Sequence, residues 1–303
     1  MEMYRQISKN KFKTFLFLLF FIMLIVAVTY AFGYIYSTPE AAFSFAVIAF
    51  IAAFSGSFIT YYYSDRILLK MADAHPVSKE ENPYLYHTIE GVALAAGLPV
   101  PKAYVIETDV PNAFATGRNP QNAAVAVTRG LLNIMNREEL EGVIAHEMSH
   151  IKNYDILYAG IAVVLAGSLV YVSGIMRRTL FYGGRRSRSR NNKSNPLILA
   201  VGLIAIIVAP VIARLIQLAM SRSREYLADA TAARVLGYPL GLASALEKLA
   251  LHNNPAAAQK EGFANEATAG LFIINPLTKN MNAGSLLNTH PPLENRIDLL
   301  RKM

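Results

Sequence analysis

The segment His146-Glu147-Met148-Ser149-His150 holds the residues whose types and spacing could do chemistry. Residues four apart lie on one face of a helix, so both imidazoles can reach a single zinc ion, at about 2.0–2.1 Å from each ring nitrogen. Glu147 is rotated by about 100° from His146 and stands beside the metal, where its carboxylate can take a proton from an attacking water. The spacing predicts a hydrolytic site with one zinc ion per chain.

A helix must present these side chains, and the preceding residues predict where it begins. Asn136 is a suitable N-cap, and Glu139 follows three residues later, as in a capping box. Leu140, Val143 and Ile144 then begin an apolar face with helical spacing. We expect this helix to run directly into the apolar segment that follows it.

A catalytic zinc needs a third protein ligand, and the chain has no Cys to supply one. Positions 153 and 156 are Asn and Ile, which excludes a third His at the metzincin spacing. Glu225 and Asp229 are also four apart, and Glu225 suits the third ligand. Asp229 would accept the second ring N–H of a ligand His and so fix its tautomer. A solvated acidic helix face is the alternative for such a pair, and the preceding histidine helix favours the metal site.

Four apolar segments are each long enough to span a bilayer, which takes about 20 residues. They are Thr14 to Tyr34, Ala41 to Tyr63, Ile156 to Met176 and Leu197 to Met220. The first exceeds the roughly 7–15 apolar residues of a signal peptide, and a short polar turn joins it to the second, so a membrane hairpin is favoured.

The composition excludes other classes of protein. Because 53% of the residues are hydrophobic and only 17% are charged, the chain is not disordered, collagen-like or a coiled coil.

Basic residues give the expected orientation. Lysine and arginine precede the first span and follow the second, so both ends of this hairpin should face the cytoplasm. The basic loop 177–195 conflicts with two further full crossings: either that hairpin crosses incompletely, or the first two spans fix the topology. We attribute the net charge of +8 to interaction with an anionic bilayer surface, and we expect no nucleic-acid binding.

These features predict a mainly α integral membrane protein with four hydrophobic helices and a zincin-like (gluzincin) α+β catalytic domain with a small sheet. The expected parts are an N-terminal transmembrane hairpin (1–63), a first catalytic segment (64–155), a second membrane hairpin (156–220) and a second catalytic segment (221–303). The two catalytic segments should fold together. The second hairpin would then bring His146, His150 and Glu225 together at the membrane surface.

Two further segments are candidates for the site. Asn112, Ala113 and Phe114 precede a predicted strand at 123–128 and could form a sheet edge that binds an extended peptide, although a plain loop would have the same sequence. His290 precedes two prolines that stiffen the chain, and a turn before the C-terminal helix is the alternative. The other histidines outside the helix, His75, His87 and His252, have no local partner pattern and are expected to be surface or interfacial residues.

The chain resembles the HtpX family of membrane-embedded zinc metalloproteases in four motifs that occur in order along it: NAFATG, HEMSH, EYLAD and THPPLENRI. This family is more distantly related to the Ste24-type CAAX prenyl protease. The resemblance covers essentially the whole chain. It implies that His146, His150 and Glu225 are zinc ligands, that Glu147 is the general base and that Asp229 supports a ligand from behind.

The resemblance adds roles for residues that spacing alone leaves open. It implies that His290 stabilises the oxyanion, that Arg296 organises the site and that Asn112 and Ala113 bind the peptide. It also implies a multi-pass protein of the cell membrane with a cytoplasmic catalytic domain, which cleaves misfolded or damaged membrane proteins. A narrow processing protease for prenylated or signal-type peptides and a membrane scaffold with a vestigial zinc site remain as alternatives. The sequence indicates no oligomeric state.

Overall fold

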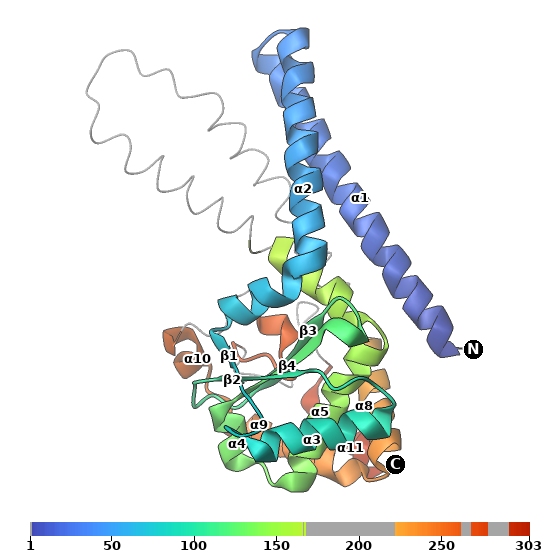
Figure 1. The fold of residues 1–303 in the computed structure, drawn as a ribbon, viewed down its shortest axis with the longest axis vertical. Coiled ribbons are helices and arrows are strands. Elements are labelled where there is room, and N and C mark those ends of the chain that lie inside the picture. The colour runs from blue at the N-terminus through green and yellow to red at the C-terminus, as the bar shows by residue number, and fades with distance from the viewer. Residues whose placement is uncertain (1, 166, 168–221, 262–267, 278–290) are drawn as a thin grey trace.

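The computed structural model describes residues 2–165, 167, 222–261, 268–277 and 291–303. Two long helices, α1 (Glu2–Tyr36) and α2 (Pro39–Met71), form the hairpin that projects from the rest of the molecule in Figure 1. Thr38 caps α2 by accepting a hydrogen bond from the Ala41 backbone N–H, and Pro39 occupies the first turn, where its missing N–H has no cost. The predicted turn is confirmed, and both helices are long and apolar enough to cross a membrane.

The second helix continues beyond the end of the apolar run at Tyr63. Its last turns reach the domain, where Leu69 and Ala72 are buried together with Ile106 and Phe114 of the sheet. The end of helix α2 and the sheet therefore share a small apolar core.

The sheet has four strands in the order β1-β2-β4-β3. They are β1 (Ala74–Pro76), β2 (Lys102–Ile106), β3 (Ala113–Gly117) and β4 (Ala123–Thr128). Strands β2 and β4 are parallel, and the other pairs are antiparallel. The small side chains of β4 are all buried, because helices and loops cover both of its faces. The strand predicted at 123–128 is confirmed, and β3 lies at an edge.

Further helices on both sides of the sheet complete the domain. They are α3 (Pro83–Ala96), α4 (Arg129–Ile134), α5 (Arg137–Lys152), α8 (Arg222–Leu236), α9 (Pro239–His252), α10 (Pro255–Glu261) and α11 (Leu293–Arg301). One core contains Leu85, Val125, Ile144, Leu246 and Leu300, so it draws on both polar segments of the chain. The molecule is mostly helical with a small mixed sheet, as predicted.

The junction after α5 differs from the prediction. The helix ends at Lys152, Tyr154 takes a left-handed backbone conformation with φ 60°, and a new helix starts at Asp155. A positive φ in a bulky residue breaks a helix, so α5 does not run directly into the next apolar segment.

Much of the second predicted membrane hairpin lies outside the described residues. The helix Asp155–Leu165 is the part of it that the structure describes. The basic loop 177–195, the run from Leu197 to Met220 and His290 all fall outside. The number of spans therefore stays a prediction.

Candidate metal centre

The start of α5 is fixed by a capping box, which sets the rotation of its histidine face. The Asn136 backbone N–H donates to Glu139 at 2.8 Å, and the Glu139 N–H donates to the Asn136 side chain at 2.9 Å. From α9, Lys248 Nζ and Ser244 Oγ donate to the same carboxylate at 2.7 and 2.6 Å. Burial opposes the charge of Glu139, but these donors outweigh it and lower its pKa. The predicted N-terminus of the helix is confirmed.

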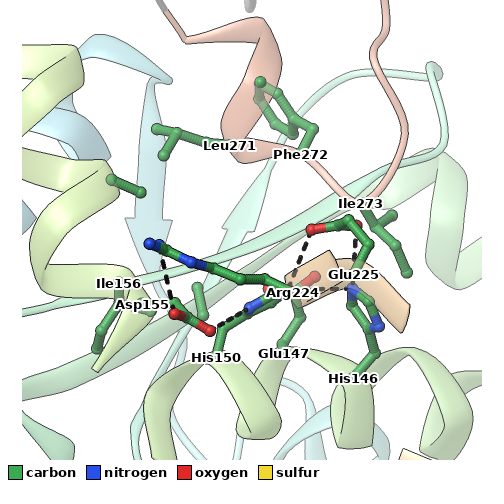
Figure 2. A pocket seen from close by; sticks show the side chains of 13 residues that line it. His146, Glu147, His150, Asp155, Ile156, Arg224, Glu225, Leu271, Phe272 and Ile273 are labelled. Carbon is green, nitrogen blue, oxygen red and sulfur yellow. Dashed lines mark hydrogen bonds and ion pairs between the residues drawn. The ribbon is translucent and has the colours of Figure 1, made fainter. Parts of the chain in front are cut away.

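Helix α8 packs against α5 and brings Glu225 opposite the two histidines, as Figure 2 shows. Ser149 Oγ lies 3.3 Å from the Ala228 carbonyl oxygen, so α5 and α8 also meet through a hydrogen bond. The Glu225 carboxylate oxygens lie 3.7 Å from His146 Nε2 and 3.5 Å from His150 Nε2. The two Nε2 atoms lie 3.2 Å apart.

These distances suit one metal ion. Ligands placed tetrahedrally at about 2.0–2.1 Å from zinc are roughly 3.3 Å from one another. The ligand atoms of His146, His150 and Glu225 all lie within 4.8 Å of one another. His146 Nδ1 faces Asp229 at 2.9 Å, and His150 Nδ1 faces Asp155 at 3.1 Å. With a metal bound, each Nδ1 would carry the proton of a neutral ring, and both Nε2 lone pairs would be free to bind the same cation.

The charges around the histidines also favour a cation. Burial would lower the pKa of His150, but the carboxylates of Asp155, Glu225 and Glu147 raise it to about 9. Burial raises the pKa of Glu147, while the two histidines and a hydrogen bond from the Ala115 backbone oppose that change. A site whose negative potential attracts a proton this strongly also attracts a divalent metal.

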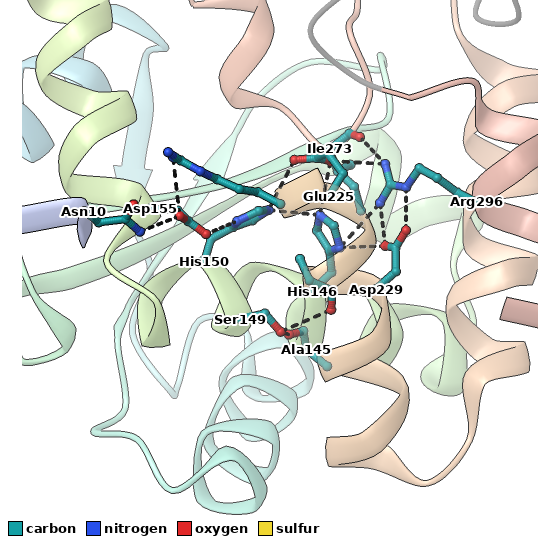
Figure 3. A network of polar contacts seen from close by, with 12 residues as sticks. Asn10, Ala145, His146, Ser149, His150, Asp155, Glu225, Asp229, Ile273 and Arg296 are labelled. Atoms are coloured by element: carbon teal, nitrogen blue, oxygen red, sulfur yellow. Dashed lines mark hydrogen bonds and ion pairs between the residues drawn. The ribbon is translucent and has the colours of Figure 1, made fainter. Parts of the chain in front are cut away.

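Arg296 and Asp229 form a buried pair behind His146, shown in Figure 3. Burial opposes the charge of Asp229, yet the Arg296 guanidinium lowers the pKa of this carboxyl to about 2. Arg296 Nη1 also lies 3.4 Å from Glu225 and donates to the Ile273 carbonyl oxygen at 3.2 Å. The Arg296 guanidinium therefore contacts both Asp229, which lies behind His146, and Glu225, the candidate third ligand.

Asp155 supports His150 as Asp229 supports His146, a role that the sequence motifs did not predict. Its carboxylate lies 3.1 Å from His150 Nδ1 and 3.5 Å from Arg224 Nη1. The break at Tyr154 turns Asp155 back toward α5. Asn153 is the sequence feature that could have predicted this role, because Asn favours helix ends. A helix that ends at Asn153 places the next acidic residue, Asp155, close to His150.

The three residues predicted to bind substrate lie at the edge strand but are buried. Asn112 Nδ2 donates to the Ile274 carbonyl oxygen at 2.9 Å, and Ile273 N–H donates to the Ala113 carbonyl oxygen at 2.9 Å. The Phe114 ring meets Phe272 edge to face, with centroids 5.2 Å apart. The segment 272–274 therefore closes this end of β3.

The pocket above the histidines lies between this closing segment and α5. Its lining includes Ala115, Glu147, Glu225, Leu271 and Ile273. His290 lies outside the described residues and is not placed relative to it. His75, His87 and His252 are exposed, as predicted.

Comparisons with known proteins point to one family. The profile described as Peptidase family M48 matches residues 79–303. The chain is 43% identical over 300 residues to a "Protease HtpX homolog" of Dictyoglomus turgidum, covering 99% of this chain and 94% of that protein. It is 49% identical over 259 residues to a "Protease HtpX homolog" of Pyrococcus furiosus, covering 85% of this chain and 86% of the relative.

Among solved structures, S. mikatae Ste24p is similar with a TM-score of 0.49 and 20% identity, covering 98% of this chain and 67% of that one. The family profile and the relatives leave one assignment for a chain with two apolar helices and a His, His, Glu cluster that could hold a metal. The chain belongs to peptidase family M48 and is a membrane metalloprotease of the HtpX type.

Proposed function

We propose that the protein is a zinc-dependent endopeptidase of the HExxH-plus-Glu type, with His146, His150 and Glu225 as ligands. The observation that carries this proposal is that one ligand atom from each residue lies within 4.8 Å of the other two, with both His Nδ1 atoms turned to carboxylates. Zinc is the expected metal because two imidazoles and one carboxylate are a common ligand set for catalytic zinc.

Glu147 is the proposed general base. Bound zinc would supply Lewis acidity toward the water and the scissile carbonyl. The Glu147 carboxylate would accept the proton of the attacking water and transfer it to the leaving amine. Its hydrogen bond from the Ala115 backbone fixes the carboxylate between the sheet edge and the ligand residues. His290 is the proposed oxyanion stabiliser, on the resemblance of its THPP segment.

The edge strand β3 would hold the substrate in an extended conformation. Asn112 bonds to Thr128 of β4, so the alternate residues Ala113, Ala115 and Gly117 direct their backbone groups away from β4. A peptide added beside Ala115 would pass next to Glu147. Ile273 already occupies the Ala113 carbonyl oxygen, so we infer that the substrate strand ends there. Asn112, Ala113 and Phe114 would then shape the closed end of the binding edge.

The proposed substrates are membrane proteins, cleaved on the cytoplasmic side in quality control of the cell membrane. Two apolar helices lead into the domain, and many of their large apolar side chains are exposed, as lipid contact requires. The basic residues before the first span and after the second favour a cytoplasmic domain in a multi-pass protein.

The test is cleavage of an unfolded, membrane-tethered reporter by the detergent-purified chain with zinc restored. Wild type should cleave it, and Glu147→Gln should bind zinc equally but lose cleavage by at least about a hundredfold, the usual share of a general base. Glu138→Gln, an exposed glutamate on the same helix, is the matched control and should cleave normally. Wild-type cleavage by Glu147→Gln would exclude this base. Zinc binding with a single cut site and no cleavage of unrelated unfolded chains would instead favour a narrow processing protease.

A further inference from the structure

We propose that Asn10, on the first membrane helix, is a positioning residue of the metal centre that acts through Asp155 on His150. The inference rests on the proposed role of His150 as a metal ligand. It makes helix α1 part of the support of the site and gives the N-terminal hairpin a role beyond anchoring.

The Asn10 amide joins two points of the main domain. Its Nδ2 donates to the Asn153 carbonyl oxygen at 2.8 Å and to Asp155 Oδ1 at 2.9 Å. An amide NH₂ has two donors, and both are used here. The other Asp155 oxygen faces His150 Nδ1 at 3.1 Å, so the contacts run unbroken from α1 to His150, as Figure 3 shows.

The two acceptors lie on either side of the break between α5 and the next helix. Tyr154, between them, has the left-handed backbone, and the ammonium group of Lys11 lies 4.5 Å from the centre of its ring. Two neighbouring residues of α1 therefore contact the short turn that aims Asp155 at His150. Because a break with a positive φ is unfavourable for Tyr, outside contacts of this kind are needed to hold it in one conformation.

Asn10 is also buried at a point where α1 is firmly packed. It is 1% exposed. Further along α1, Phe17 and Phe21 belong to the same apolar cluster as Tyr158 and Ile161 of the helix that follows Asp155. This packing fixes the distance between the helices, so the amide can act as a spacer of defined length.

The chemistry of the amide suits this task better than that of a carboxylate. Asp155 must stay a hydrogen-bond acceptor for His150 Nδ1–H, and a neutral donor leaves its charge in place. A carboxylate at position 10 would repel Asp155, and alanine would leave the Asn153 carbonyl oxygen and Asp155 Oδ1 without this donor. We therefore expect Asn10→Asp to disturb the site more than Asn10→Ala.

The experiment measures metal binding by the full-length chain in detergent, without reference to cleavage. Zinc affinity is obtained by competition with a chromophoric chelator, and the ligand field by the visible spectrum of the Co²⁺-substituted protein. Asn10→Ala should weaken zinc binding about 10- to 100-fold and alter the Co²⁺ spectrum, as loss of a supporting partner of a ligand does. Asn10→Asp should weaken it further.

Thr14→Ala is the matched control. Thr14 lies one turn along α1, is equally buried, and donates to the Asn10 carbonyl oxygen of its own helix at 2.8 Å. The substitution disturbs the packing of α1 without removing a contact to Asp155, so the zinc affinity and the Co²⁺ spectrum should stay as in wild type. Equal losses in Thr14→Ala and Asn10→Ala would show a general packing effect and overturn the proposal.

Asp155→Asn gives the second test, because Asn10 is proposed to act only through Asp155. Asn10→Ala added to Asp155→Asn should cause little further loss, whereas independent effects would add. Additive losses, or wild-type affinity in Asn10→Ala, overturn the role of Asn10 and leave the proposed protease untouched. A wild-type chain that binds no zinc would overturn both proposals.

Discussion

Arg296 donates to both oxygens of Asp229, from Nε at 2.8 Å and from Nη2 at 2.7 Å, and the arginine is 0% exposed. Asp229 in turn faces His146 Nδ1. A guanidinium has the fork geometry that holds a carboxylate in one orientation, which an ammonium lacks. The pair joins α11, at the end of the chain, to the histidine helix.

We expect Arg296→Met to lower the free energy of unfolding by about 3–5 kcal/mol, because it leaves a buried carboxylate without its cation. Zinc affinity should fall as well, since Asp229 is no longer oriented against His146. Thermal unfolding with and without a chelator measures both effects. Arg301→Met is the control on the same helix: its pair with Glu247 is exposed and should contribute about 0–1 kcal/mol. Equal effects of the two variants would contradict the importance of the buried pair.

The capping glutamate Glu139 should make stability depend on pH. Its pKa in the folded chain lies below the ordinary value of 4.5, so its contribution is fully present above that value and is lost as the pH falls through the lowered pKa. Glu139→Gln should cost about 1.5–3 kcal/mol at pH 6, typical of a hydrogen bond to a charged group. The difference in melting temperature from wild type should shrink toward pH 3.

Both chains contain the same candidate metal centre, so its effect on the melting temperature is the same in both. The difference in melting temperature between wild type and Glu139→Gln therefore reports on Glu139. Glu138→Gln, at the exposed preceding residue, is the matched control and should melt close to wild type at pH 6. A gap between wild type and Glu139→Gln that stays constant from pH 6 to pH 3 would argue against a lowered pKa for this carboxyl.

The crossing of α5 and α9 should be intolerant of even one methyl group. A Cβ on Gly142 would lie 2.7 Å from the Leu242 backbone nitrogen, so the helices must separate. Gly142→Ala should therefore destabilise the fold by about 1–3 kcal/mol, in the range of other overpacked sites. Gly91 in α3 has nothing within 4 Å of its would-be Cβ, so Gly91→Ala should stabilise by up to about 1 kcal/mol. Chemical denaturation of both variants measures the contrast, and equal changes would refute it.

Local features of the fold could be predicted because neighbours in sequence cause them. Asn136 and Glu139 close the capping box within one turn, and Thr38 with Pro39 starts α2 within two residues. The break at Tyr154 was missed, because a left-handed tyrosine is stabilised by contacts from another helix rather than by its own preference.

The sequence by itself determined the spacing that aligns His146 with His150 and sets Glu147 beside them, because the helical period places residues four apart on one face. It also determined the apolar hairpin, through the length of its two helices. The resemblance of the THPPLENRI segment already implied a role for Arg296, but only the tertiary structure decided that Asp155 enters the site and that Asn10 reaches it from helix α1. Such contacts join residues distant in sequence, and they depend on how the helices pack, which no local pattern of residues specifies.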